Sequence, residues 1–154
     1  MNVSGPEAPS AGEYAIVTAR FNSFVTTRLA QGARDAFVNR GIAADAIRQF
    51  EVAGAWELAP VIAAAARTGR FRALVACAAV IRGETAHFEH IARACMDALA
   101  RVQTETQVPI GLAVLTTDTV EQAIERAGGK AWNKGEEAAL AALEAADVLD
   151  TFRR

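Results

Sequence analysis

The sequence predicts an α/β fold, a three-layer sandwich with a four-stranded parallel sheet between two layers of helices. Four short apolar runs of strand-forming character recur along the 154-residue chain, and each is followed by a segment of helical character. Strands that alternate with helices form parallel sheets covered on both faces. Because the crossovers in such sheets are right-handed, a small doubly wound sandwich is the expected arrangement.

The strands and the first two helices can be placed by residue. The strands are expected at residues 14–18, 47–52, 73–81 and 110–115. A first helix should begin after Asn22 or Ser23 as its N-cap and end at Gly41. A second is expected over residues 56–67, with Pro60 in its first turns, where proline is tolerated.

Three more helices complete the layers. The third is expected over residues 86–104, ending before a proline. The fourth opens with Thr119 and Gln122 at capping-box spacing. A last helix is expected over residues 136–146, after Asn133.

Composition and charge argue against two classes of function, nucleic-acid binding and membrane spanning. The formal net charge is −2 with both signs mixed, so a nucleic-acid partner is not expected. No apolar run approaches the ~20 residues of a membrane span.

The apolar fraction of 52% includes much alanine in helical stretches. Some of these helices must bury more than one face, which indicates subunit contacts. Residues 1–12 are expected to form a flexible arm and residues 13–154 a single domain. Cys77 and Cys95 are interpreted as buried thiols, which favours a reducing cytoplasm.

In doubly wound sheets ligands bind beyond the carboxyl ends of the strands. The segments there are residues 20–22, 53–57, 82–87 and 116–118. In the third, Gly83 and Thr85 precede a helix and could form an anion site or an ordinary cap. His87 could transfer protons beside a phosphate ester. His90 forms a His-x-x-His pair with it, but no third ligand follows, so no metal site is expected.

Two further residues have alternative readings. Phe21 lies between a strand and a helix, where an aromatic ring either joins the core or stacks on a planar ligand. Glu57, near a helix start, either favours the helix dipole or accepts hydrogen bonds from sugar hydroxyls.

Taken together and in order, five stretches resemble the signatures of the lumazine synthase family. They are residues 19–22 (ARFN), 54–58 (GAWEL), 80–89 (VIRGETAHFE), 121–128 (EQAIERAG) and 133–135 (NKG). The third and fourth are long and specific, and the resemblance extends over residues 14–146. It implies a flavodoxin-like topology and an enzyme of riboflavin biosynthesis, a transferase without a cofactor.

The resemblance also implies roles for individual residues. Phe21 would stack on a pyrimidinedione ring, and His87 would be the catalytic proton-transfer residue. The remaining substrate-binding residues would be Ala55, Trp56, Glu57, Ala79, Val80, Ile81 and Leu112. The phosphate-binding residues would be Glu84, Thr85 and, from a neighbouring subunit, Arg126. Lys134 matches a lysine of the family near the site and receives no role.

Two positions depart from the family pattern. Ala53 stands where a proline is usual, and Leu112 stands where a phenylalanine is often contributed to the adjacent site. A leucine can pad a ring but cannot stack on it, which predicts weaker substrate binding. The departure leaves open a carrier that holds lumazine or flavin without making it. A receiver-like signalling domain would need an acidic cluster at the strand ends, which the sequence lacks.

The implied reaction joins 5-amino-6-(D-ribitylamino)uracil to 3,4-dihydroxy-2-butanone 4-phosphate and yields 6,7-dimethyl-8-ribityllumazine. The implied assembly is a homo-oligomer with shared sites, either a pentamer or a capsid of twelve pentamers, and riboflavin synthase is a candidate pathway partner. Residues 128–135 contain no insertion, as in capsid-forming relatives, but Trp132 stands where those relatives often carry glycine. The choice between pentamer and capsid therefore stays open.

Overall fold

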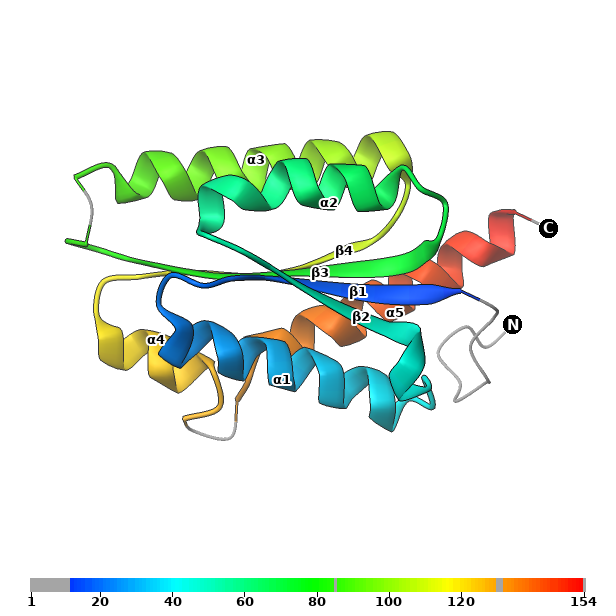
Figure 1. Ribbon diagram of the computed structural model, residues 1–154, viewed down its shortest axis with the longest axis horizontal. Helices are drawn as coiled ribbons and strands as arrows, with labels where there is room; N and C mark the ends of the chain where they lie inside the picture. Colours follow the sequence, from blue (N-terminus) through cyan, green and yellow to red (C-terminus); the bar gives the residue numbers. More distant parts are fainter. Residues whose placement is uncertain (1–11, 85, 130–131, 154) are drawn as a thin grey trace.

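A four-stranded parallel sheet lies at the centre of the molecule. The computed structural model describes residues 12–84, 86–129 and 132–153 (Figure 1). Its strands are β1 (Glu13–Ala19), β2 (Ile47–Val52), β3 (Phe71–Ile81) and β4 (Ile110–Thr117). They lie in the order β2-β1-β3-β4, and every neighbouring pair is parallel. The chain thus winds outward in both directions from β1 and β3, and the predicted fold class and strands are confirmed.

Helices cover both faces of this sheet. Figure 1 shows α2 (Leu58–Ala66) and α3 (Phe88–Thr106) on one face, with α1 (Ser23–Asn39), α4 (Val120–Arg126) and α5 (Lys134–Phe152) on the other. Short 3-10 turns precede β2 (Ala44–Ala46) and α2 (Ala55–Glu57). Within the described ranges, none of the helices combines the length and apolar character that a membrane span requires.

The central strand β3 explains why two cores form. From Ala73 to Ile81 each of its side chains is buried, as expected for a parallel strand covered on both faces. Alternate residues enter opposite cores: Val75 and Cys77 face α1 and α5, whereas Leu74 and Ala76 face α2 and α3.

The two cysteines are buried free thiols, as predicted. Burial raises the pKa of the Cys77 thiol to about 12 and that of the Cys95 thiol to about 11. Both side chains therefore act as small apolar groups in the two cores.

Several helix ends differ from the prediction. The predicted second helix begins instead as the 3-10 turn, and α2 proper starts at Leu58. Helix α3 starts two residues later than expected because a turn at Gly83 (φ 88°) occupies the preceding segment, so His87 is its N-cap residue. Helix α5 runs on to Phe152, beyond the predicted end at residue 146, because Asp147 and Asp150 pair with Arg72 on β3.

The caps of α4 and α5 are made by side chains as predicted, with one change, whereas Asn22 is the N-cap residue of α1 without a side-chain capping hydrogen bond. The Thr119 hydroxyl accepts a hydrogen bond from the Gln122 amide at 3.1 Å, as a capping box requires. The Gln122 side chain, however, accepts from the amide of Asp118 at 2.9 Å. Asn133 caps α5 by accepting from the Glu136 amide at 3.1 Å.

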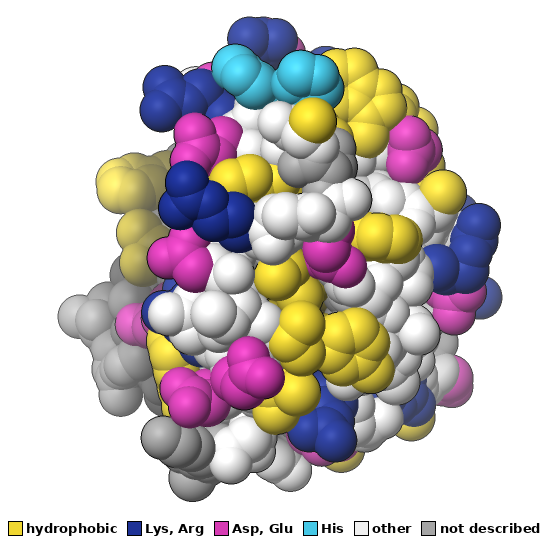
Figure 2. Space-filling model, turned by 90° about the vertical axis from the view of Figure 1, so that its left-hand side faces the viewer, with side chains coloured by type: hydrophobic (Ala, Val, Ile, Leu, Met, Phe, Trp, Pro, Cys, Tyr) yellow, Lys and Arg dark blue, Asp and Glu magenta, His cyan; other side chains and the backbone are white. Residues whose placement is uncertain are grey.

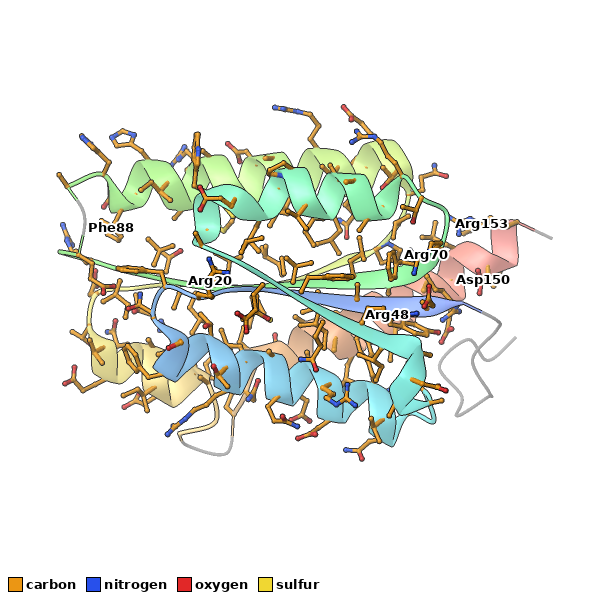
Figure 3. All side chains as sticks on the ribbon, in the orientation of Figure 1. Arg20, Arg48, Arg70, Phe88, Asp150 and Arg153 are labelled. Atoms are coloured by element: carbon orange, nitrogen blue, oxygen red, sulfur yellow. The ribbon has the colours of Figure 1, made fainter. Side chains whose placement is uncertain are left out.

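Ion pairs gather at the amino end of the sheet (Figure 3). The Arg72 guanidinium, whose side chain is 12% exposed, contacts Asp147 and Asp150 at 2.6 Å each, and it donates to the Tyr14 hydroxyl at 3.3 Å. Burial alone lowers the pKa of Arg72, but its hydrogen bonds to the two aspartates raise it overall. These contacts tie the end of α5 to β3.

A second set of contacts closes the same end. Glu13 pairs with Arg48 and with Arg70, each at 2.8 Å. Hydrogen bonds from these two arginines lower the pKa of Glu13. Arg153 donates to the carbonyl oxygen of Gln107 at 2.8 Å, so the end of α5 is also joined to the α3–β4 turn.

Candidate active site at the carboxyl end of the sheet

The loop after β1 presents an aromatic side chain to solvent. The amides of Arg20 and Phe21 donate to the carbonyl oxygens of Val52 and Ala53 at 2.8 and 3.0 Å, which continues the β1–β2 pairing beyond the strands. The Phe21 side chain is nevertheless 57% exposed. Its backbone is therefore fixed while its ring stays outside the core, which favours the stacking interpretation over the core interpretation.

The loop after β2 places a second aromatic side chain and a carboxylate nearby. Gly54 is extended, and the amide of Glu57 donates to its carbonyl oxygen at 3.1 Å, which closes the 3-10 turn. Trp56 points outward with 65% of its surface exposed. Glu57 is half-buried directly before α2, so its carboxylate is held beside the cleft described next.

These two loops and the end of β3 enclose a cleft of about 210 Å³. The predicted residues in its wall are Phe21, Ala55, Trp56, Glu57, Ala79, Val80, Ile81 and Glu84. Ala19, Gly54 and Ile91 complete the lining. The wall is mostly apolar with two carboxylates at its edge, which suits a planar ring that carries polar substituents.

A second hollow, of about 330 Å³, lies over the loop that joins β3 to α3. Its lining residues are Arg82, Gly83, Ala86, His87, Phe88, Glu89 and His90. Figure 2, which faces the carboxyl end of the sheet, shows the two histidines together at one side of this face with arginine or lysine side chains beside them. Their ring centroids are 5.8 Å apart. This hollow is more polar than the cleft and carries the predicted proton-transfer residue.

The β3–α3 loop is fixed at its start. The amide of Arg82 donates to the carbonyl oxygen of Thr117 at 2.8 Å, and the Glu84 amide donates to that of Ile81 at 3.3 Å. The Arg82 guanidinium lies 5.7 Å from the centre of the Phe88 ring. Glu84 lines the cleft while Gly83 and Ala86 line the second hollow, so this loop lies between the two. Thr85 lies outside the described residues.

Two predicted site residues lie apart from the cleft and the second hollow. Leu112, on the edge strand β4, is 39% exposed and lines a different hollow together with Lys134 of α5. Arg126 ends α4 and is half-buried. The chain's own cleft is thus built without Leu112 and Arg126, and their service to a neighbouring subunit stays a prediction.

Metal ligation has no support in the described part of the chain, where His, Cys, Asp and Glu side chains form no group of three or more suited to an ion. His87 and His90 are therefore a pair without a third such ligand among those residues.

Sequence reasoning missed three features of the cleft. Ala19 and Ile91 contribute apolar wall, and Asn22 links two of its loops through its side chain. The position of Ile91 one turn into α3 was a usable signal for an inward-facing residue. Asn22 was expected only as an N-cap, and its longer-range contacts depend on the tertiary fold.

The fold and the site define a class: a doubly wound α/β protein that binds a small ligand where its strand order reverses, next to a histidine-bearing loop. The family model for 6,7-dimethyl-8-ribityllumazine synthase matches residues 12–150. The chain therefore belongs to the 6,7-dimethyl-8-ribityllumazine synthase family, and the resemblance seen in the sequence is confirmed. Membership makes the protein an enzyme of lumazine formation that acts on small molecules.

Proposed function

We propose that the protein condenses 5-amino-6-(D-ribitylamino)uracil with 3,4-dihydroxy-2-butanone 4-phosphate to give 6,7-dimethyl-8-ribityllumazine, phosphate and water, the penultimate step of riboflavin biosynthesis. One observation carries the proposal: a mostly apolar cleft that contains the expected ring-binding residues lies beside a polar hollow that contains His87. The two substrates differ in the same way, since one is a planar ring and the other a phosphate ester.

The ring substrate would occupy the cleft. Phe21 would stack on the pyrimidinedione, and backbone groups of residues 79–81 would bind its edge. Pairing of β1 with β3 ends at Thr18 and Cys77, whereas β3 continues to Ile81, so this part of β3 lies beyond its partner strand on that side. Ala55, Trp56 and Glu57 would hold the ribityl chain, with the Glu57 carboxylate accepting from its hydroxyls.

The sugar phosphate would occupy the second hollow. The backbone amides of Glu84 and Thr85 and the Thr85 hydroxyl would bind the phosphate at the turn before α3, where backbone amides favour an anion. His87 would act as general acid and base, a role typically worth ~10²–10⁴-fold in rate. Arg126 of a neighbouring subunit would complete the phosphate site. Its guanidinium would stabilise the negative charge of the phosphate as it leaves.

The reaction itself requires orientation and proton transfer. The 5-amino group attacks the ketone, and loss of water gives an imine. Phosphate is then eliminated, and attack of the ribitylamino nitrogen closes the ring with loss of a second water. Holding both substrates in adjacent hollows would supply much of the rate enhancement, so the proposal assigns no metal or redox cofactor.

The separation of Leu112 and Arg126 from the chain's own cleft supports a proposal about assembly. We propose at least a pentamer, in a cytoplasmic enzyme, with each site shared between neighbours. Pentamer and capsid remain alternatives. Gly128 adopts φ 101°, and its amide donates to the Trp132 carbonyl at 2.7 Å, so tryptophan at position 132 is compatible with a hydrogen bond between these two residues. Light scattering of the purified protein distinguishes the two, and a monomer at micromolar concentration would contradict shared sites.

Product formation tests the proposed function. Purified protein is incubated with both substrates, and the absorbance and fluorescence of the lumazine product are followed against reactions that lack one substrate. The proposal predicts enzyme-dependent product formation. Tight lumazine binding without product would instead favour a carrier, the reading that Leu112 leaves open.

A further inference from the structure

The side chain of Asn22 contacts both the end of β3 and the loop that lies between the ring cleft and the second hollow. Its amide nitrogen donates to the carbonyl oxygen of Ala79 at 2.9 Å and to Oε1 of Glu84 at 2.9 Å. A side-chain amide carries two N–H groups, so both are used. Asn22 thereby connects the loop after β1 with the end of β3 and with the loop before α3.

The backbone of Asn22 is unusual in a way that fits this contact. Its φ of 64° and ψ of 44° lie in the left-handed region, which asparagine tolerates better than most residues. Asn22 occupies the N-cap position of α1, yet its side chain makes no capping hydrogen bond. Residues held in sparsely populated conformations cluster at functional sites, and here the conformation turns the amide away from α1 toward β3.

The contact also explains how Glu84 is held. Glu84 is exposed at a turn, where a glutamate side chain ordinarily samples several rotamers. The bond from Asn22 fixes Oε1 and leaves Oε2 to accept from a donor in the cleft. At the same time, the bond to Ala79 supplies a donor to β3 beyond Cys77, where pairing with β1 has ended.

We propose that Asn22 is a positioning residue for the ring substrate, acting through Glu84. The inference rests on the proposed function. The amino groups of the diaminopyrimidine are hydrogen-bond donors, and a carboxylate that is already oriented accepts from them at lower entropic cost. The amide of Asn22 therefore sets the affinity of the cleft for a ring that carries N–H donors.

A double-mutant cycle in the full-length protein tests this inference. Asn22→Gly removes the side-chain amide. Because glycine readily adopts positive φ, the fold of this variant should be preserved. Its KM for the pyrimidinedione should rise roughly tenfold, the loss expected for a hydrogen bond to a charged group, with a smaller change in the KM for the sugar phosphate. Because Asn22 acts through Glu84, Asn22→Gly/Glu84→Ala should bind the ring substrate about as weakly as Glu84→Ala alone.

Gln107→Gly is the matched control, since Gln107 also adopts positive φ (57°) but lies in the α3–β4 turn at the opposite end of the sheet. Its kinetics should equal those of the unmutated protein. Fully additive effects of Asn22→Gly and Glu84→Ala, or an unchanged KM in Asn22→Gly, would overturn the positioning role while leaving the proposed function intact. If the unmutated protein forms no lumazine, the proposed function fails, and this inference fails with it.

Discussion

The side chains at the two ends of the sheet differ in kind and in exposure. At the amino end, Arg72 and Glu13 are paired within the chain, and the contacts tie α5, β1, β2 and β3 together. At the carboxyl end, Phe21 and Trp56 are mostly exposed around a cleft. Figure 3 shows the labelled Arg48, Arg70, Asp150 and Arg153 at one end, far from Phe88 at the other. Stability and ligand binding are therefore assigned to different ends.

Substitution of His87 should give the largest functional effect. His87→Ala is expected to lower kcat about tenfold to thousandfold, because proton transfer is lost while the proximity of the substrates survives. The thermal unfolding midpoint should stay unchanged, since the exposed His87 belongs to neither core. Steady-state kinetics and calorimetry check both expectations, and unchanged kinetics would remove His87 from the mechanism.

Arg72 should show the reverse pattern. Arg72→Met keeps the length of the side chain but leaves Asp147 and Asp150 without their cation, at an expected cost of about 2 kcal/mol in the free energy of unfolding. Lumazine formation per folded molecule should not change.

A matched control is Arg67→Met. The charged groups of Arg67 and Glu105 are 3.5 Å apart, and both side chains are more than half exposed. Loss of this pair should therefore cost less than about 0.5 kcal/mol in the free energy of unfolding. Urea titration compares the two variants, and equal costs would show that the Arg72 network contributes no special stability.

Substitution of Leu112 should have a smaller effect in the opposite direction, a gain in ligand binding. The position is assigned to a neighbouring subunit's site. Leu112→Phe should tighten binding of the ring substrate by roughly 0.5–1.5 kcal/mol through an added aromatic contact. Fluorescence titration with lumazine measures the change. Exclusion of the ligand by the new ring would show that the pocket is shaped around leucine.

The smallest effect is expected at Glu13 and depends on pH. Because its pKa is lowered in the folded protein, Glu13 stabilises the fold above its unfolded pKa near 4.5, and this contribution is lost as pH falls through the folded value. Glu13→Gln should therefore be slightly less stable than the unmutated protein at pH 7, with the difference shrinking as the pH falls below the unfolded pKa of 4.5. A difference that grows as pH falls would contradict the lowered pKa.

The sequence predicted the four strands and the segments at their carboxyl ends from local patterns, whereas the individual residues of the cleft wall came from the resemblance to the family. Runs such as 73–81 are apolar enough to be buried on both faces, and parallel strands bring their carboxyl ends to one edge. The 3-10 turn at Ala55–Glu57 and the full length of α5 were not predictable in this way. Both depend on packing and on partners far along the chain, such as Arg72 for the end of α5.

The contacts of Asn22 show the same limit. An asparagine before a helix is ordinarily a capping residue, and nothing local indicates that its amide reaches Ala79 and Glu84. The contacts of Leu112 and Arg126 are harder still to predict from the sequence, because their proposed partners belong to another subunit.

The most direct test of this division is a crystal structure of the protein with 6,7-dimethyl-8-ribityllumazine bound. The account predicts the lumazine ring stacked on Phe21 against residues 79–81, with its ribityl chain directed to Glu57 and no change among the ion pairs of Arg72 and Glu13. A lumazine bound elsewhere, with the cleft at the carboxyl end left empty, would contradict it.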